Sequence, residues 1–259
     1  MSKILSFTNQ KGGVGKTTSA VNVALSLAVS EVKTLLIDLD PQSNASTGLA
    51  DIIKDKKGNV YDVMLKSESI NEVVTSTSFA HLDIIISTND LVGAEIELVG
   101  IMAREYQLQK ALTTIKEDYD IIIIDCPPTL GLLSMNSLCA ADFLLVTLQS
   151  EYLALEGLGQ IVGVIDQLKS AGANPGLSLG GILMTMYDNR TRLSYEVWQE
   201  VSQHYPRHVF RTAIPRTVRL SEAPSFGKTI FEYDPSSLGA RAYKSFAEEV
   251  EVRFLRTLN

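Results

Sequence analysis

The feature that most constrains the fold is the glycine-rich run KGGVGKTT, which spans residues 11–18. It directly follows an apolar segment of strand character, residues 4–8, and leads into a segment of helical period, residues 17–30. Gly12, Gly13 and Gly15 allow the backbone to turn tightly and to point several N–H groups into one concavity. The N-terminus of the following helix adds a favourable field for anions. The run is therefore predicted to be a phosphate-binding loop between a strand and a helix.

The other residues of this loop have distinct expected roles. Lys16 is expected to reach the β- and γ-phosphates of a nucleotide, and the Thr17 hydroxyl is suited to Mg²⁺. Thr18 can hydrogen-bond the α-phosphate from the first helical turn, and Val14 belongs to the same backbone cradle. The sequence therefore predicts ATP or ADP, together with Mg²⁺, as the ligands of this loop.

Acidic residues follow two further strand-like segments. Asp38 and Asp40 come at the end of the segment 34–38, and Asp125 ends the segment 120–125. Carboxylates at the carboxyl ends of strands lie where open α/β sheets bind ligands. We expect Asp40 to orient or deprotonate the attacking water, Asp38 to support the metal shell, and Asp125 to hold Mg²⁺ directly or through water. The alternative for Asp38 and Asp40 is that they only cap a turn.

Short β-rich apolar runs alternate with longer helical segments along the whole chain. This pattern predicts a single doubly wound α/β domain over residues 1–259, with a mostly parallel sheet flanked by helices. Residues 121–124 are all isoleucine, which indicates a central strand covered on both faces. The predicted strands are residues 4–8, 34–38, 82–87, 120–125, 143–148, 179–186 and 209–214. The predicted helices are residues 17–30, 91–102, 105–117, 132–140, 155–171, 193–204 and 238–258, with short helices at 61–65 and 70–75.

Composition excludes several other classes of protein. Apolar residues make up 45% and charged residues 20% of the 259 residues, which is typical of a globular chain with a sizeable core. Cys126 and Cys139 form no CxxC pair, so a disulfide framework or zinc site is not expected. There is no apolar run of about 18 residues and no signal-peptide pattern. We therefore expect a cytoplasmic protein.

The charge is unevenly distributed. A net charge of −7 argues against a protein that coats nucleic acid with its whole surface. Residues 1–185 hold 12 Lys/Arg and 21 Asp/Glu, a balance of −9, whereas residues 186–230 hold seven and four, a balance of +3. The positive stretch, which contains Arg190, Arg216 and Arg219, is either a binding face or a modest asymmetry of the kind that many proteins have.

Lys11 distinguishes this loop from an ordinary phosphate-binding loop. With this additional lysine the run resembles the deviant Walker A motif of the ParA/MinD ATPases. The chain is similar almost end to end to the chromosomal ParA (Soj) partition proteins. The matching stretches are TNQK (8–11), DLDPQ (38–42), GAEIEL (93–98), DCPP (125–128), EYLALEGL (151–158), LMTMYD (183–188) and IPRTVRLSEAPS (214–225). The turn at residues 30–33 departs from the glycine-containing turn of relatives, but it is remote from the phosphate site.

The resemblance implies an ATP-hydrolysing homodimer with ATP sandwiched between its subunits. Lys11 would contact the nucleotide of the partner subunit, and Gly12 would pack at the dimer seam. Asp40 matches the aspartate that hydrolysis needs. Pro215 and its neighbours, with Met184 opposite, match the pocket around the adenine.

The resemblance also implies partners. Arg190 and Arg219 match basic positions that hold the dimer on double-stranded DNA without sequence preference; the alternative is that they only make surface ion pairs. Arg216 fits either the nucleotide pocket or DNA. A ParB (Spo0J)-like protein would stimulate hydrolysis and release. The implied task is chromosome or plasmid partitioning by a protein associated with the nucleoid.

Two other functions use the same kind of fold. A MinD-like membrane switch requires a basic amphipathic C-terminal helix. Apolar residues do recur every four positions from 238 to 254, but acidic and basic residues share that helix, so packing on the sheet is expected. A reductase like the nitrogenase iron protein would need Cys126 and Cys139 as cluster ligands, whereas both are expected to lie in the core.

Overall fold

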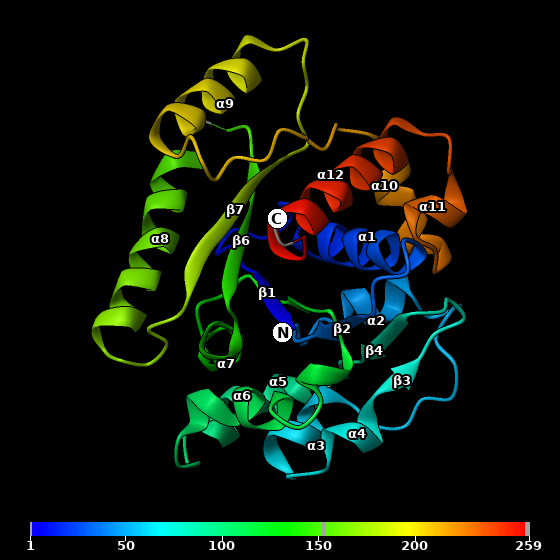
Figure 1. The fold of residues 1–259 in the computed structure, drawn as a ribbon, viewed down its shortest axis with the longest axis vertical. Helices are drawn as coiled ribbons and strands as arrows, with labels where there is room; N and C mark the ends of the chain where they lie inside the picture. Colours follow the sequence, from blue (N-terminus) through cyan, green and yellow to red (C-terminus); the bar gives the residue numbers. More distant parts are fainter. Residues whose placement is uncertain (1, 152–153, 257–259) are drawn as a thin grey trace.

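The computed structural model describes residues 2–151 and 154–256. Its centre is a seven-stranded sheet of order β3-β4-β2-β5-β1-β6-β7, with helices on both faces (Figure 1). All neighbouring strands are parallel except β3 and β4. This confirms the predicted α/β class. The strands are β1 (Lys3–Phe7), β2 (Thr34–Asp38), β3 (Thr75–Ser76), β4 (Leu82–Ile85), β5 (Ile121–Asp125), β6 (Phe143–Gln149) and β7 (Ser178–Thr185).

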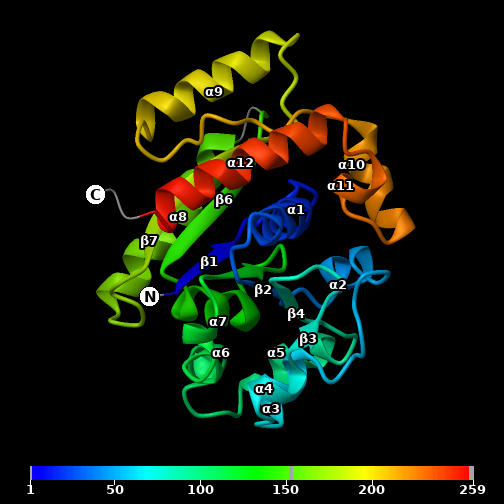
Figure 2. The ribbon, with the colours of Figure 1, turned by 45° about the vertical axis from the view of Figure 1, so that its right-hand side comes forward.

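The helices form one layer on each face of the sheet. On one face α1 and α12 lie side by side, and on the other lie α3, α5, α6, α7 and α8 (Figures 1 and 2). Within the described ranges, no helix is long and apolar enough to span a membrane. The α-helices are α1 (Lys16–Val29), α2 (Asn44–Gly48), α3 (Val60–Leu65), α4 (Ile70–Val73), α5 (Leu91–Leu98), α6 (Gln107–Leu112), α7 (Leu132–Ala140), α8 (Ala154–Ser170), α9 (Arg192–His204), α10 (Val218–Glu222), α11 (Ile230–Tyr233) and α12 (Leu238–Phe254). The 3₁₀ turns are η1 (Arg104–Tyr106), η2 (Lys116–Asp118) and η3 (Ala223–Phe226).

The central strand β5 separates two hydrophobic cores. Ile122 and Ile124 belong to the core under α7 and α8, and Ile121 and Ile123 belong to the core under α1 and α12. This alternation follows from the twofold period of a strand. The register pairs the last residue of β5, Asp125, with Phe7 of β1 and Asp38 of β2. The phosphate loop and two acidic strand ends therefore meet at one level of the sheet edge.

The prediction of a regular β-strand at residues 209–214 is wrong. This segment is extended beside β7 but makes only two isolated bridges, Ile182 with Val209 and Tyr187 with Pro215. Between them, the backbone N–H groups of Arg211 and Thr212 donate to the carboxylate of Glu249 on α12, at 2.9 and 2.7 Å. Because a side chain takes these donors, the ladder with β7 is interrupted.

Several predicted helix boundaries are also wrong. The segment 105–117 breaks into η1, α6 and η2, and after α6 the hydroxyls of Thr113 and Thr114 bond back to backbone carbonyls, which disfavours a continuous helix there. The segment 91–102 is helical only in α5, and Ala103 has a left-handed φ of 51°. The predicted end of the last helix, residues 257–258, lies outside the described residues.

Candidate active site

The loop between β1 and α1 has a glycine-dependent backbone and is held by two hydrogen bonds. Gly13 and Gly15 have φ of 71° and 84°, which favour glycine, and Gly15 is the N-cap of α1. The Thr185 hydroxyl at the end of β7 donates to the carbonyl of Val14 at 2.8 Å. The amide of Lys11 donates to Asn9 Oδ1 at 3.0 Å. The loop is therefore attached to both β1 and β7 at the carboxyl edge of the sheet.

Lys16 is buried inside this loop. Its ammonium group donates to the carbonyl of Lys11 at 3.2 Å, so the side chain folds back over the loop. Burial lowers the pKa of Lys16, and the negative charge of Asp125 opposes that change. A cation held in a poorly solvated concavity attracts a phosphate more strongly than an exposed one.

Asp125 fits an Mg²⁺ site. The residue is fully buried, and neither carboxylate oxygen has a hydrogen-bond partner among the described residues. Burial, and then the charge of Asp38, raise the pKa of Asp125 well above its usual range. A divalent cation would satisfy both oxygens. Within the described residues no group of three or more His, Cys, Asp or Glu could hold a metal by itself, so the substrate phosphates, Thr17 and water would complete the shell.

Asp38 and Asp40 are held by backbone and serine donors. Asp38 accepts hydrogen bonds from the Ser46 amide at 2.8 Å, the Ser46 hydroxyl at 2.7 Å and the Asp40 amide at 3.1 Å. Burial raises the pKa of Asp38 to about 6. Asp40 accepts from the Gln42 amide at 2.9 Å, and its carbonyl accepts from the Ser87 hydroxyl at 2.7 Å. Asp38 thus fixes the turn that positions Asp40. These hydrogen bonds agree both with Asp38 as support for the metal shell and with the alternative that it only caps a turn.

Sequence reasoning missed both serines. Ser46 and Ser87 lie eight and 47 residues from the aspartates that they contact. Only the parallel pairing of β2 and β4 brings Ser87 to this edge. No local motif signals such contacts.

A cavity of about 530 Å³ adjoins the phosphate loop. Its walls come from the start of α1, from α2, from the end of β7 and from the segment around α10 and η3. The residues predicted for nucleotide binding that line it are Gly15, Thr17, Thr18, Pro215 and Arg216. Further lining residues that sequence reasoning missed include Asn22, Met186, Thr217, Leu220, Ser221 and Lys228.

The structure corrects the prediction for Met184. This residue is fully buried in the core below α8, and the next two residues, Thr185 and Met186, line the cavity instead. Alternation along β7 turns the Met184 side chain to the opposite face of the sheet. A resemblance between sequences located the segment correctly but not the side that each residue faces.

Lys11 and Gly12 lie outside the cavity. The Lys11 ammonium forms an ion pair with Glu151, and the two side chains are 55% and 44% exposed. Gly12 and Gly13 are also exposed on this side of the loop. The two lysines of the loop therefore differ, because Lys16 is internal and Lys11 is available at the surface.

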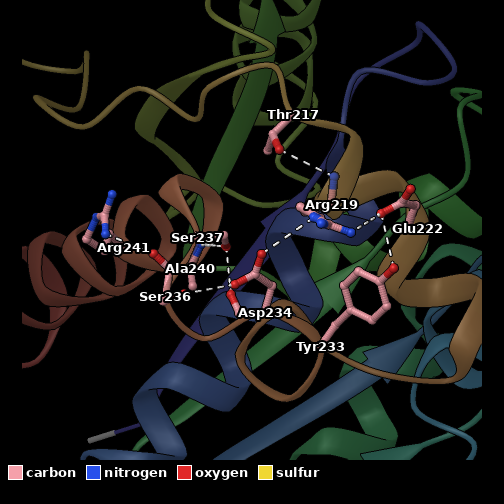
Figure 3. Close-up of polar contacts among 9 residues, drawn as sticks. All are labelled: Thr217, Arg219, Glu222, Tyr233, Asp234, Ser236, Ser237, Ala240 and Arg241. Atoms are coloured by element: carbon pink, nitrogen blue, oxygen red, sulfur yellow. Dashed lines mark hydrogen bonds and ion pairs between the residues drawn. The ribbon is translucent and has the colours of Figure 1, made fainter.

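The two arginines predicted to contact DNA are both paired with carboxylates. Arg190 donates through Nε and Nη2 to the two oxygens of Asp188, at 2.9 and 2.8 Å. These hydrogen bonds lower the pKa of Asp188 to about 2. Arg219 contacts Glu222 and Asp234 (Figure 3). Both arginines are exposed, and neither lines the cavity.

Neither cysteine is exposed. Cys126 and Cys139 are fully buried, and burial raises the pKa of both thiols, that of Cys139 to about 11. On α12, Phe246, Val250 and Phe254 are buried against the sheet. The positions that a bridging cluster or a membrane-binding face would require are thus used for packing.

A strand–loop–helix unit with a buried lysine, and a carboxylate at the tip of the adjacent parallel strand, define a P-loop nucleotide-binding protein. Comparison with known proteins agrees with this class. An AAA domain family model matches residues 2–179. The chain is 47% identical to the chromosome partitioning protein ParA of Myxococcus xanthus, over 97% of this chain and 88% of that protein. It is also 47% identical to the sporulation initiation inhibitor protein Soj of Bacillus subtilis, over 96% of this chain and 98% of that protein.

The chain therefore belongs to the ParA/Soj family of chromosome-partitioning ATPases. Among solved structures, it superposes on cobyrinic acid a,c-diamide synthase from Mycobacterium smegmatis with bound ADP and magnesium. The TM-score is 0.82 and the identity 34%, with all of both chains covered. The predicted fold and family are thus confirmed by independent comparisons.

Proposed function

We propose that this chain hydrolyses ATP, forms a homodimer around the bound nucleotide, and in that state binds double-stranded DNA without sequence preference. The observation that carries this proposal is the different placement of the two loop lysines. Lys16 is buried next to Asp125, where it can act on the nucleotide of its own subunit. Lys11 is exposed outside the cavity, where it can reach the nucleotide of a second subunit.

The chemistry of hydrolysis would then be divided among the residues of the site. The loop amides and Lys16 hold the phosphates, and Thr18, Pro215 and Arg216 contact the rest of the nucleotide. Asp40 orients the attacking water, and Lys11 stabilises the charge that develops on the transferring phosphoryl group. Mg²⁺, held by Thr17 and Asp125 with support from Asp38, would neutralise phosphate charge when bound.

Binding to DNA would use the positive stretch of the chain. Arg190 and Arg219 are exposed, and a dimer presents two copies of each. Phosphate contacts of this kind are independent of sequence and sensitive to salt. We propose that a ParB-like protein stimulates hydrolysis and releases the dimer, and that the protein works on the nucleoid in the cytoplasm to partition a chromosome or plasmid.

The deciding experiment measures binding to duplex DNA with and without ATP, and repeats it with anionic vesicles. We expect ATP-dependent binding to DNA that weakens steeply with salt, and no binding to vesicles. Vesicle binding without DNA binding would instead support the membrane switch.

Two variants test the nucleotide site. Lys16→Ala should abolish nucleotide binding, whereas Asp40→Ala should retain ATP and accumulate the dimer. Normal ATP turnover by Asp40→Ala would contradict the role of Asp40.

A further inference from the structure

Arg219 is held by two carboxylates that come from different elements. Its Nη1 lies 3.1 Å from Glu222 Oε2, one turn further along α10, and its Nε lies 3.5 Å from Asp234 Oδ2, just after α11 (Figure 3). The three side chains are 53%, 41% and 29% exposed. Their summed charge is −1, which is unfavourable next to a DNA phosphate although Arg219 itself is cationic.

Other contacts fix both carboxylates. The Tyr233 hydroxyl donates to Glu222 Oε2 at 3.1 Å, and the Tyr233 ring lies 5.9 Å from the Arg219 guanidinium. Asp234 Oδ1 is 3.1 Å from the Ser236 hydroxyl, and the Asp234 carbonyl accepts from Ser237 at 2.7 Å. The two carboxylates therefore have defined positions and are not freely moving surface side chains.

The same short helix borders the nucleotide cavity. Thr217, Leu220 and Ser221 line that cavity, while Arg219 lies between them in sequence and does not line it. Leu220 also packs against Gly239 at the start of α12, where an added Cβ would lie 2.9 Å from Leu220 Cγ. Because Leu220 and Arg219 are neighbours on the same short helix, a nucleotide that shifts α10 through Leu220 would also shift the guanidinium.

We propose that Glu222 and Asp234 form an acidic clamp that restrains Arg219 from binding DNA, and that nucleotide binding at α10 loosens this clamp. In the clamp, N–H groups of Arg219 donate to carboxylates, so these groups are not free to donate to a phosphate oxygen. Exposed ion pairs are weak, so a phosphate can displace them once α10 moves. This inference rests on the proposed function, because it concerns regulation of the same DNA face.

The test compares Glu222→Gln and Asp234→Asn with the unmodified protein. Affinity for a duplex DNA of fixed length is measured by fluorescence anisotropy across a salt series, without nucleotide and with a non-hydrolysable ATP analogue. Each substitution removes one restraining charge, so we expect affinity to rise by about threefold to tenfold. The gain should be larger without nucleotide, where the clamp is closed. Asp234→Asn leaves the contact between Glu222 and Tyr233 intact, so the two variants test the clamp independently.

The matched control is Glu248→Gln, which changes the net charge equally. Glu248 is exposed and lies ten residues along α12, about 15 Å from its start. In addition, Arg219→Ala combined with Glu222→Gln should show none of the gain, because the clamp acts through Arg219. If the unmodified protein binds duplex DNA with ATP but the clamp variants bind no tighter than Glu248→Gln, or bind more weakly, the clamp is wrong. If the unmodified protein binds no DNA at all, the proposed function itself fails.

Discussion

At the scale of single residues, the site contains two buried carboxyl groups, Asp38 and Asp125, whose charged forms are disfavoured by burial. Burial raises the pKa of Asp38 to about 6 and that of Asp125 well above its usual range. A carboxyl group whose pKa is higher in the folded than in the unfolded chain takes up a proton on folding. Its contribution to stability is complete below the unfolded value of about 4 and is lost as the pH rises through the folded value. These two groups therefore make the ligand-free protein least stable at neutral and alkaline pH.

The variant Asp125→Asn tests this residue-level argument. It keeps the size of the side chain and removes the cost of burying an ionisable carboxyl group, which outweighs the opposing effects of Thr17 and Lys16, so the ligand-free protein should gain about 1–3 kcal/mol of unfolding free energy at pH 7.5. The gain should shrink as the pH falls toward the unfolded value of about 4, below which Asp125 carries a proton in both the folded and the unfolded chain. Thermal unfolding at several pH values measures both effects. A melting temperature of Asp125→Asn below that of the unmodified protein at pH 7.5 would show that Asp125 is stabilised by a partner.

The matched control is Asp188→Asn, at an exposed aspartate. Hydrogen bonds from Arg190 lower the pKa of Asp188 to about 2, so the sign of its contribution is opposite. That variant should leave the protein unchanged or slightly less stable at pH 7.5. Mg²⁺ and ATP should stabilise the Asp125→Asn variant less than the unmodified protein, whereas they should stabilise the Asp188→Asn variant as much as the unmodified protein.

At the scale of elements, the sequence predicted the helices and strands that have a regular apolar pattern. It missed the short elements whose ends are set by tertiary contacts. The isoleucine strand β5 and the helices α1, α7 and α9 lie within a residue or two of their predicted bounds, because their apolar periods are long and unbroken. The short elements α2, α10 and α11 were not predicted. Their ends depend on distant partners, as where Asn22 on α1 accepts from the first amide of α11 at 3.0 Å. The phosphate loop was predictable from local sequence, whereas the cavity wall built by α10 was not.

Two glycines provide a prediction about packing between elements. A Cβ at Gly181 on β7 would lie 2.6 Å from Cζ of Phe210, and the guanidinium of Arg253 lies 4.0 Å from the same ring. Gly181→Ala should therefore destabilise the protein by about 1–3 kcal/mol through overpacking. Gly163→Ala on α8 meets nothing within 4 Å and should stabilise it by about 0.5–1 kcal/mol, because alanine favours the helix. Chemical denaturation of both variants checks the opposite signs, and equal effects would contradict the packing at Phe210.

At the scale of the whole molecule, the net charge of −7 and the proposed binding to DNA are compatible only if charge is concentrated locally. The positive stretch has a balance of only +3 in one chain, and carboxylates pair with both of its predicted contact arginines. Under the proposed function, a single subunit would therefore be a poor ligand for DNA. The proposed dimer would double the number of phosphate contacts, which would raise both the affinity and its dependence on salt. On this proposal, the nucleotide would regulate DNA binding by regulating the dimer.

Lys11 is the residue on which this coupling should depend. Lys11→Ala removes an exposed side chain, so unfolding free energy should change by no more than about 0.5 kcal/mol and ATP should still bind. The dimer that ATP induces in an Asp40→Ala background should be lost, and DNA binding should fall with it. Light scattering during size-exclusion chromatography measures the dimer, and Lys57→Ala, at another exposed lysine, is the control. A Lys11→Ala protein that dimerises as well as the Lys57→Ala control would place Lys11 outside the seam and would contradict the proposed contact with the nucleotide of a second subunit.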